Sequence, residues 1–170
     1  MQRRSFIMTT GKTAAITAVA ASLATRLGAA DAAAPGTRIN HSVCKWCYDK
    51  IPLDDLCTAG KEFGLQSVEL LMPGDFATLK KHGMTCAMVS FPGGKTASGV
   101  SVGGITKAFN RVEHHDALVA AYEPHLKASA EVGAKQVICF SGNREGLSDE
   151  QGLENCAIGL KRILPLAEKL

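Results

Sequence analysis

The chain has 170 residues and a formal net charge of +3, from 19 Lys and Arg against 16 Asp and Glu. Four of the basic residues and one acidic residue precede residue 33, so residues 33–170 carry 15 of each sign. A near-neutral chain without a basic patch is not expected to bind nucleic acid. Residues 33–170 suffice for one domain with a hydrophobic core and are too few for two.

The start of the chain has the order of a bacterial export signal. The twin arginines Arg3-Arg4 precede an apolar, alanine-rich run over 14–24, and residues 30–32 fit a small-residue cleavage site. The run is well short of the ~20 residues that span a bilayer. We expect residues 1–32 to be a twin-arginine export signal, followed by a linker over 33–37. The mature protein would be exported, to the periplasm, without stable membrane association. An uncleaved anchor or a disordered alanine-rich tail is the alternative.

The first half of the remaining chain alternates between strand and helix patterns. Residues 38–44 predict the first strand, and a helix follows over 52–63. Residues 67–71 predict the second strand, followed by a short helix over 76–82 that ends at a glycine. The apolar residues 84–89 predict the third strand.

The second half repeats the alternation after a longer connection. Residues 91–110 form a glycine-rich stretch, which we expect to be a long functional loop. A helix is predicted over 112–132, kinked by its internal proline, and the fourth strand over 136–140. Ser148-Asp149-Glu150-Gln151 matches a capping box, and the helix behind it would bury one apolar face. That face comprises Leu153, Cys156, Ala157, Leu160, Ile163 and Leu164.

Four strand–helix units predict an α/β fold with parallel strands and right-handed helical crossovers. The closed barrel of this type contains eight such units in typically ~250 residues. We therefore expect residues 38–170 to form the first four β/α units of a (β/α)8 TIM barrel. Its working end would be the rim at the carboxyl ends of the strands.

Several segments together resemble one family. The stretch NHSVCKWCY at 40–48 resembles the opening strand and loop of hydroxypyruvate-isomerase-like proteins, in the xylose-isomerase-like sugar isomerase/epimerase superfamily. Further similarity lies in SVELL (67–71), GITKAFN (104–110), EHHD (113–116) and VICFSGNR (137–144), and in pieces between 154 and 168. The resemblance covers nearly all of the chain after the signal.

The resemblance implies a (β/α)8 barrel that isomerises or epimerises a small hydroxy-carbonyl or sugar-like substrate. In such chemistry a carboxylate moves a proton between neighbouring carbons, often beside a divalent metal. In these families the catalytic carboxylates and metal ligands lie mainly on strands five to eight. The catalytic residues are therefore expected beyond Leu170, and no metal or other cofactor is expected within this chain. A divalent metal would belong to the full-length protein.

Three candidate substrate-binding residues lie on the first two strands. Glu69 interrupts an apolar strand, and a buried carboxylate is costly without partners. We expect Glu69 to face the active rim, or alternatively to form an ion pair within the sheet. His41 and Trp46 lie at or just past the first strand, where a histidine binds substrate or carries a proton. A hydrogen-bonded histidine beside a packing tryptophan is the alternative.

Four further candidates lie in the second half. Lys107 and Asn110, on the glycine-rich loop, would bind an anionic or hydroxylated substrate, or would simply be solvated. His115 would reach the site from the start of the following helix, although helix-start histidines such as His114 and His115 are commonly solvated. Asn143 follows the fourth strand, where barrel enzymes place binding groups, but it also suits a turn.

Two other functions remain open. Cys44 and Cys47 form a C-x-x-C motif that would act as a redox dithiol or form a disulfide in an exported protein. A non-catalytic half-barrel is the other alternative, because open strand edges invite pairing and would permit a homodimer. The remaining cysteines lie in apolar strands or on apolar helix faces, and are expected to be small core residues rather than zinc ligands. They are Cys57, Cys86, Cys139 and Cys156.

Overall fold

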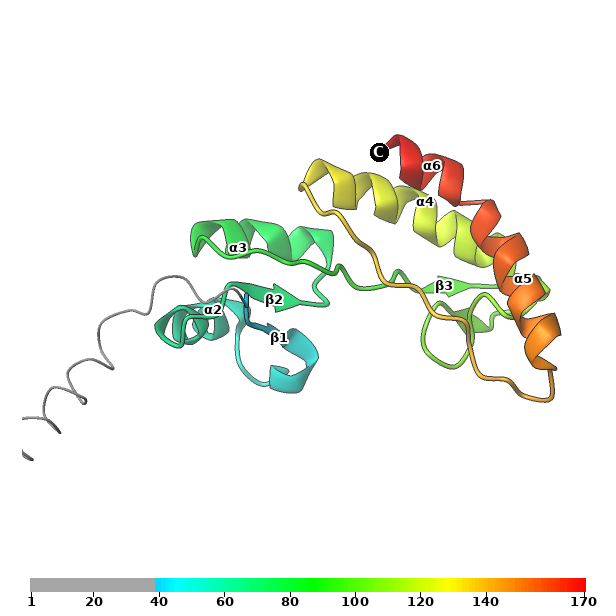
Figure 1. Ribbon diagram of the computed structural model, residues 1–170, viewed down its shortest axis with the longest axis horizontal. Coiled ribbons are helices and arrows are strands. Elements are labelled where there is room, and N and C mark those ends of the chain that lie inside the picture. Colours follow the sequence, from blue (N-terminus) through cyan, green and yellow to red (C-terminus); the bar gives the residue numbers. More distant parts are fainter. Residues whose placement is uncertain (1–38) are drawn as a thin grey trace, which may run out of the picture. The chain divides into compact units, whose positions relative to one another are not determined.

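A computed structural model describes residues 39–170 (Figure 1). The fold belongs to one compact unit, Asn40–Leu170. The expected export signal and linker lie outside the described residues. Within 39–170, no helix is both long enough and apolar enough to cross a membrane. This part of the chain is a mixed α/β unit with short parallel strands and helices.

The parallel strands follow one another in chain order. Strand β1 (Ser42–Cys44) pairs in parallel with β2 (Ser67–Glu69), with Val43 opposite Val68. An isolated parallel bridge joins Ser67 to Thr85, and a second joins Val89 to Val137. The neighbours are therefore β1, β2, the segment 84–90 and the segment 136–140, as expected for successive β/α units.

The third and fourth predicted strands are not formed as continuous strands. The Val68 amide donates to the Thr85 carbonyl at 3.0 Å, whereas the Val89 amide donates to the Gln136 carbonyl at 2.9 Å. The start of the segment 84–90 thus bridges to β2, and its end bridges to the segment 136–140. Each bridge involves a single residue pair, so no continuous strand is formed. The predictions of strands over 84–89 and 136–140 were wrong in this respect, although both segments keep their places in the order.

The first core lies between β1, β2 and two helices. Helix α2 (Leu53–Glu62) begins after Pro52, with acidic residues in its first turn as the helix dipole favours. A single 3-10 turn, η1 (Lys45–Tyr48), connects β1 to α2, and η2 (Pro73–Asp75) leads from β2 into α3 (Phe76–Lys81). The buried residues of this core are Leu56, Cys57, Val68, Leu71, Leu79, Met84 and Cys86.

The predicted loop over 91–110 contains a small hairpin. Strand β3 (Gly94–Lys95) pairs antiparallel with β4 (Ser101–Val102). Gly103 follows with a φ of +109°, and a Cβ at this position would lie 2.5 Å from the Pro92 carbonyl oxygen. Only glycine fits that close approach, so the glycine content of this stretch serves a folded hairpin rather than an unstructured loop.

The second core is built around α4 (His115–Glu131). The 3-10 turn η3 (Val112–His114) precedes α4, and Pro124 lies inside the helix without ending it. Phe109 and Tyr122 pack with ring centroids 5.5 Å apart. The buried apolar residues of this core are Val102, Phe109, Leu118, Tyr122 and Ile163.

The last predicted helix divides into α5 (Asp149–Lys161) and α6 (Leu164–Lys169). The Ser148 hydroxyl accepts the Gln151 amide at 3.1 Å, which confirms the N-cap. The Gln151 side chain binds Asn155 instead of completing the capping box. The predicted apolar face is only partly covered: Leu153 is 73% exposed and Leu164 is 45% exposed, whereas Cys156 and Leu160 are half-buried against the second core. Of the residues predicted on that face, only Ile163 is buried.

An ion pair between the two helices of the first core gives a pH-dependent contribution to stability. The side chains of Lys81 and His82 donate to Asp54 at 2.6 and 2.8 Å and hold the pKa of Asp54 below its ordinary value. A carboxylate whose pKa is lowered by folding stabilises above its unfolded pKa, and that stabilisation is lost as pH falls through the folded pKa. We expect Asp54→Asn to unfold at lower urea than the parent at pH 7, and this difference to disappear in strong acid. An equal difference at both pH values would contradict the role of this ion pair.

Candidate functional site

Glu69 is buried at the end of β2, and both of its carboxylate oxygens accept hydrogen bonds from groups within the chain. Its exposed fraction is 9%, and one carboxylate oxygen accepts the Met88 amide at 2.8 Å. The Ser67 hydroxyl donates to the other oxygen, and the Cys86 thiol lies 3.8 Å from the first. These partners are neutral, so Glu69 is held by hydrogen bonds rather than by the cation that an ion pair requires.

The residue after Glu69 has a strained backbone. Leu70 has a φ of +60°, a region that costs a residue with a Cβ roughly 1–2 kcal/mol. Its amide donates to the Met88 carbonyl at 2.9 Å, and the next carbonyl, of Leu71, accepts from Ser90 at 2.9 Å. Strand β2 therefore ends in a sharp turn that is fixed against the third segment.

Two neighbouring cavities lie after the third and fourth parallel segments. One, of about 550 Å³, is lined by the hairpin and by Phe91. The other, of about 360 Å³, lies between the hairpin turn, η3 and the loop after the fourth segment. Thr106 and Lys107 line both cavities, which places Lys107 between them. The smaller cavity is lined by Thr96, Ser98, Val100, Thr106, Lys107, Arg111, Glu113, His114 and Glu145.

The smaller cavity contains donors that can bind an anionic, hydroxylated molecule, beside the two carboxylates of Glu113 and Glu145. Arg111 donates to the carbonyls of Arg144 and Glu145 at 3.2 and 2.7 Å, which fixes its guanidinium at the wall. Lys107 forms no ion pair within residues 39–170 and remains exposed. Ammonium and guanidinium groups bind carboxylate or phosphate, and Thr96 and Ser98 add hydroxyl groups.

Buried side chains from η3, α4 and α5 hold the loop that carries Lys107. Three consecutive carbonyl groups, of residues 108–110, each accept one hydrogen bond from a side chain. His114 Nδ1 donates to the first at 3.0 Å, His115 Nε2 to the second at 2.9 Å, and Asn155 Nδ2 to the third at 2.9 Å. His115 is almost fully buried and is occupied by this bond, so in this structure it positions the loop.

Asn110 connects this loop to the turn after the fourth segment. Its side-chain amide donates to the Asn143 carbonyl at 2.6 Å, and the Asn143 amide donates to Thr106 at 2.9 Å. The buried Asn110 Oδ1 has no hydrogen-bond partner in the described chain, and a Cβ added at Gly142 would lie within 2.5 Å of it, so this position requires glycine. Asn110 is thus a positioning residue, whereas the side chain of Asn143 is exposed.

The other two candidates lie away from the cavities. His41 is exposed and precedes β1, where its carbonyl accepts the Gln66 amide at 2.9 Å. Trp46 is 64% exposed on η1. Neither residue lines the two cavities after the third and fourth segments, and neither does Glu69. Of the predicted site residues, the structure therefore brings together Lys107, Asn110, His115 and Asn143.

Sequence reasoning missed Arg111 and the hydroxyl pair Thr96 and Ser98. The hydroxyls are 2.9 Å apart at the tip of the hairpin, and Thr96 Oγ1 accepts the Val100 amide at 3.1 Å. A threonine and a serine two residues apart in a glycine-rich stretch are a signal for such a turn. Arg111 could have been noticed from its position beside Asn110.

The cysteines differ in their surroundings. All six are free thiols: Cys44 is half-buried and Cys47 is exposed. Burial raises the pKa of Cys57 and of Cys86, as expected for unreactive core thiols. The prediction that Cys139 is a core residue was wrong, because it is exposed at an edge of the fourth segment that carries no backbone hydrogen bond within residues 39–170; partial burial nevertheless raises the pKa of its thiol. Among residues 39–170, no group of three or more His, Cys, Asp or Glu is arranged to hold a metal ion.

No protein-family model matches this chain, and no curated protein matches it. The structure defines the class of protein as mixed α/β with parallel strands. The resemblance to hydroxypyruvate-isomerase-like proteins rests on the sequence segments alone.

Proposed function

We propose that this chain is the first half of a (β/α)8 barrel of the sugar isomerase/epimerase type, exported through the twin-arginine pathway. Four parallel segments in chain order, most of them followed by a helix, support the barrel half. The sequence resemblance supports the isomerase type. On this proposal the chain forms the substrate end, and proton transfer and any divalent metal come from the later strands of the barrel.

The observation that carries the proposal is the smaller cavity. It lies at the carboxyl ends of the third and fourth segments, the end at which parallel α/β folds bind ligands. Lys107 and Arg111 would bind a carboxylate, and the hydroxyls of Thr96 and Ser98 would bind the oxygens of the substrate. A small hydroxy-carbonyl acid such as hydroxypyruvate has both kinds of group.

The substitution Lys107→Met tests this ligand class. We expect the full chain to bind hydroxypyruvate weakly by calorimetry at low salt, and Lys107→Met to weaken binding by about tenfold through loss of one charge-assisted hydrogen bond. Lys127→Met is the matched control, because Lys127 is exposed on α4 and lines neither cavity. Equal affinity in the two variants would exclude Lys107 from the site.

The same preparation tests whether the catalytic groups lie on the later strands of the barrel. On the proposal, it has no isomerase activity with or without added divalent metal. Measurable turnover would mean that the catalytic groups lie within this chain, and Glu113 and Glu145 would be the first candidates because they are the carboxylates of the cavity.

A second candidate function is a non-catalytic, self-assembling half-barrel. The observation that favours it is the open edge of the fourth segment, which carries no backbone hydrogen bond on its outer side within the described chain. For the redox alternative at Cys44 and Cys47, the test is whether Cys44→Ser abolishes any disulfide formed under mild oxidation.

A further inference from the structure

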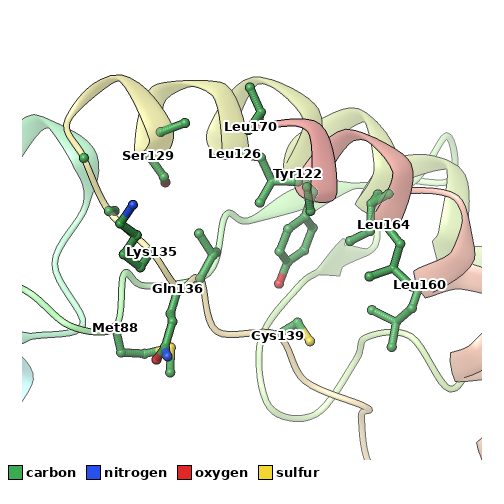
Figure 2. Close-up of a pocket in the computed structure, with 16 residues that line it drawn as sticks. Met88, Tyr122, Leu126, Ser129, Lys135, Gln136, Cys139, Leu160, Leu164 and Leu170 are labelled. Atoms are coloured by element: carbon green, nitrogen blue, oxygen red, sulfur yellow. The ribbon is translucent and has the colours of Figure 1, made fainter.

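A groove of about 580 Å³ lies between α4, α6 and the extended segment 133–139 (Figure 2). Figure 2 shows the side chains of Tyr122, Leu126 and Leu164 projecting from the helices on one side, with the segment that carries Gln136 and Cys139 on the other. Most lining side chains are apolar. They include Met88, Tyr122, Leu126, Val137, Ile163 and Leu164.

One wall of the groove is an unpaired strand edge. Val89 exchanges two hydrogen bonds with this segment, through the Gln136 carbonyl at 2.9 Å and the Ile138 amide at 3.0 Å. Backbone groups alternate in direction along an extended chain, so those of Val137 and Cys139 point to the opposite side. No backbone hydrogen bond joins either residue to another part of the described chain.

Contacts within the fold fix the two sides of the groove. The Tyr122 hydroxyl donates to the Ile138 carbonyl at 3.0 Å, which ties α4 to the extended segment beneath it. Ile163 anchors the start of α6 in the second core, while Leu164 and Leu170 are left 45% and 55% exposed. The helix side of the groove is thus apolar and uncovered, next to backbone groups that lack partners.

A β-strand with apolar side chains can pair with the backbone groups of one wall and cover the apolar side chains of the other. Its backbone would pair with Val137 and Cys139, and its side chains would cover the leucines of α6. A small apolar molecule would cover the leucines but would leave the amide and carbonyl groups of the edge without partners.

The chain carries a complementary strand. Strand β1 pairs with β2 on one side, and within residues 39–170 no strand pairs with its other side. Trp46, Tyr48 and Ile51 follow it closely and are exposed apolar side chains. We infer that a second copy of this chain docks its β1 edge along residues 137–139, with its apolar residues against the groove.

A pair of copies related by a two-fold axis satisfies all four edges at once. Each copy offers one β1 edge and one edge at 137–139, so two reciprocal contacts close the assembly without leaving an edge for a third copy. Parallel docking of β1 continues the order of the sheet from one copy into the next. This inference rests on the second candidate function, a self-assembling half-barrel, because in a barrel continued by later strands the same edges would pair within one chain.

Two leucine substitutions test the docking surface. Leu164 and Leu153 are both exposed on neighbouring helices, and only Leu164 lines the groove. By sedimentation of the full chain over a range of concentrations, we expect a dimer for the parent and for Leu153→Lys. Leu164→Lys is expected to raise the dimer dissociation constant by at least about tenfold, because a lysine ammonium would be buried against the docked strand.

Amide hydrogen exchange tests the pairing of the strand edge itself. In the dimer, the amides of Val137 and Cys139 are expected to exchange slowly, and in Leu164→Lys they are expected to exchange quickly at the same concentration. A parent chain that stays monomeric up to its solubility limit would overturn the inference. So would open-ended oligomers, fast exchange at both amides in a dimer, or identical dissociation constants for the two lysine variants.

Discussion

The substitution Gly159→Ala is expected to destabilise the protein by about 1–3 kcal/mol, the usual cost of overpacking a close-packed site. Gly159 lies on α5, where an added Cβ would be 2.7 Å from both His115 Nε2 and Phe109 Cδ1. His115 holds the loop before α4 by its bond to the Phe109 carbonyl. The added methyl group must therefore displace either a core aromatic ring or the histidine that positions the Lys107 loop.

The control lies on the same helix. At Gly152 an added Cβ would meet nothing within 4 Å, so Gly152→Ala is expected to stabilise the protein by about 0.5–1 kcal/mol through its higher helix propensity. The free energy of unfolding of both variants and the parent is measured by urea denaturation. Stabilisation by both alanines would show that α5 does not pack against His115 as described.

The substitution Glu69→Ala is expected to cost about 2–3 kcal/mol of unfolding free energy, because it leaves a buried donor without an acceptor. The Met88 amide, at 2.8 Å from the carboxylate, and the Ser67 hydroxyl both lose their partner. Glu69→Gln keeps an acceptor oxygen for the Met88 amide at nearly the same volume. Its expected cost is about 1 kcal/mol, typical of the net worth of one hydrogen bond.

This pair of variants separates a structural role of Glu69 from a functional one. Urea denaturation gives the two free energies of unfolding, and calorimetry with hydroxypyruvate gives the affinity. A large loss of stability in Glu69→Ala with the affinity retained is the result expected from the geometry. If Glu69→Ala unfolds at the same urea concentration as the parent but no longer binds the ligand, the carboxylate belongs to the substrate site instead.

The positioning of Lys107 depends on residues that do not line the larger cavity beside it. The carbonyls of residues 108–110 are held from one side by His114, His115 and Asn155. The amides of residues 109 and 110 pair from the other side with the carbonyls of Phe140 and Ser141. A loop whose backbone groups are bonded on both sides is preorganised, and less of the binding free energy is spent on ordering it.

Local sequence patterns were enough to predict the elements that depend on neighbouring residues. The helix over 52–63 and the N-cap at Ser148 follow from side chains within one or two turns, and both are present. The order of the parallel segments was also predicted correctly. The strand over 67–71 formed but ends at Glu69, because Leu70 takes a left-handed conformation to reach Met88.

Tertiary structure decided which apolar side chains are buried and which partners the polar side chains bind. Cys139 and Leu153 were predicted to be buried because they lie in apolar patterns, but both are exposed. His115 and Asn110 have the composition of a binding site, yet their partners are backbone carbonyls brought near by the fold. Hydrophobic periodicity indicates which face of an element is apolar, whereas the identity of its neighbour depends on contacts between residues far apart in the chain.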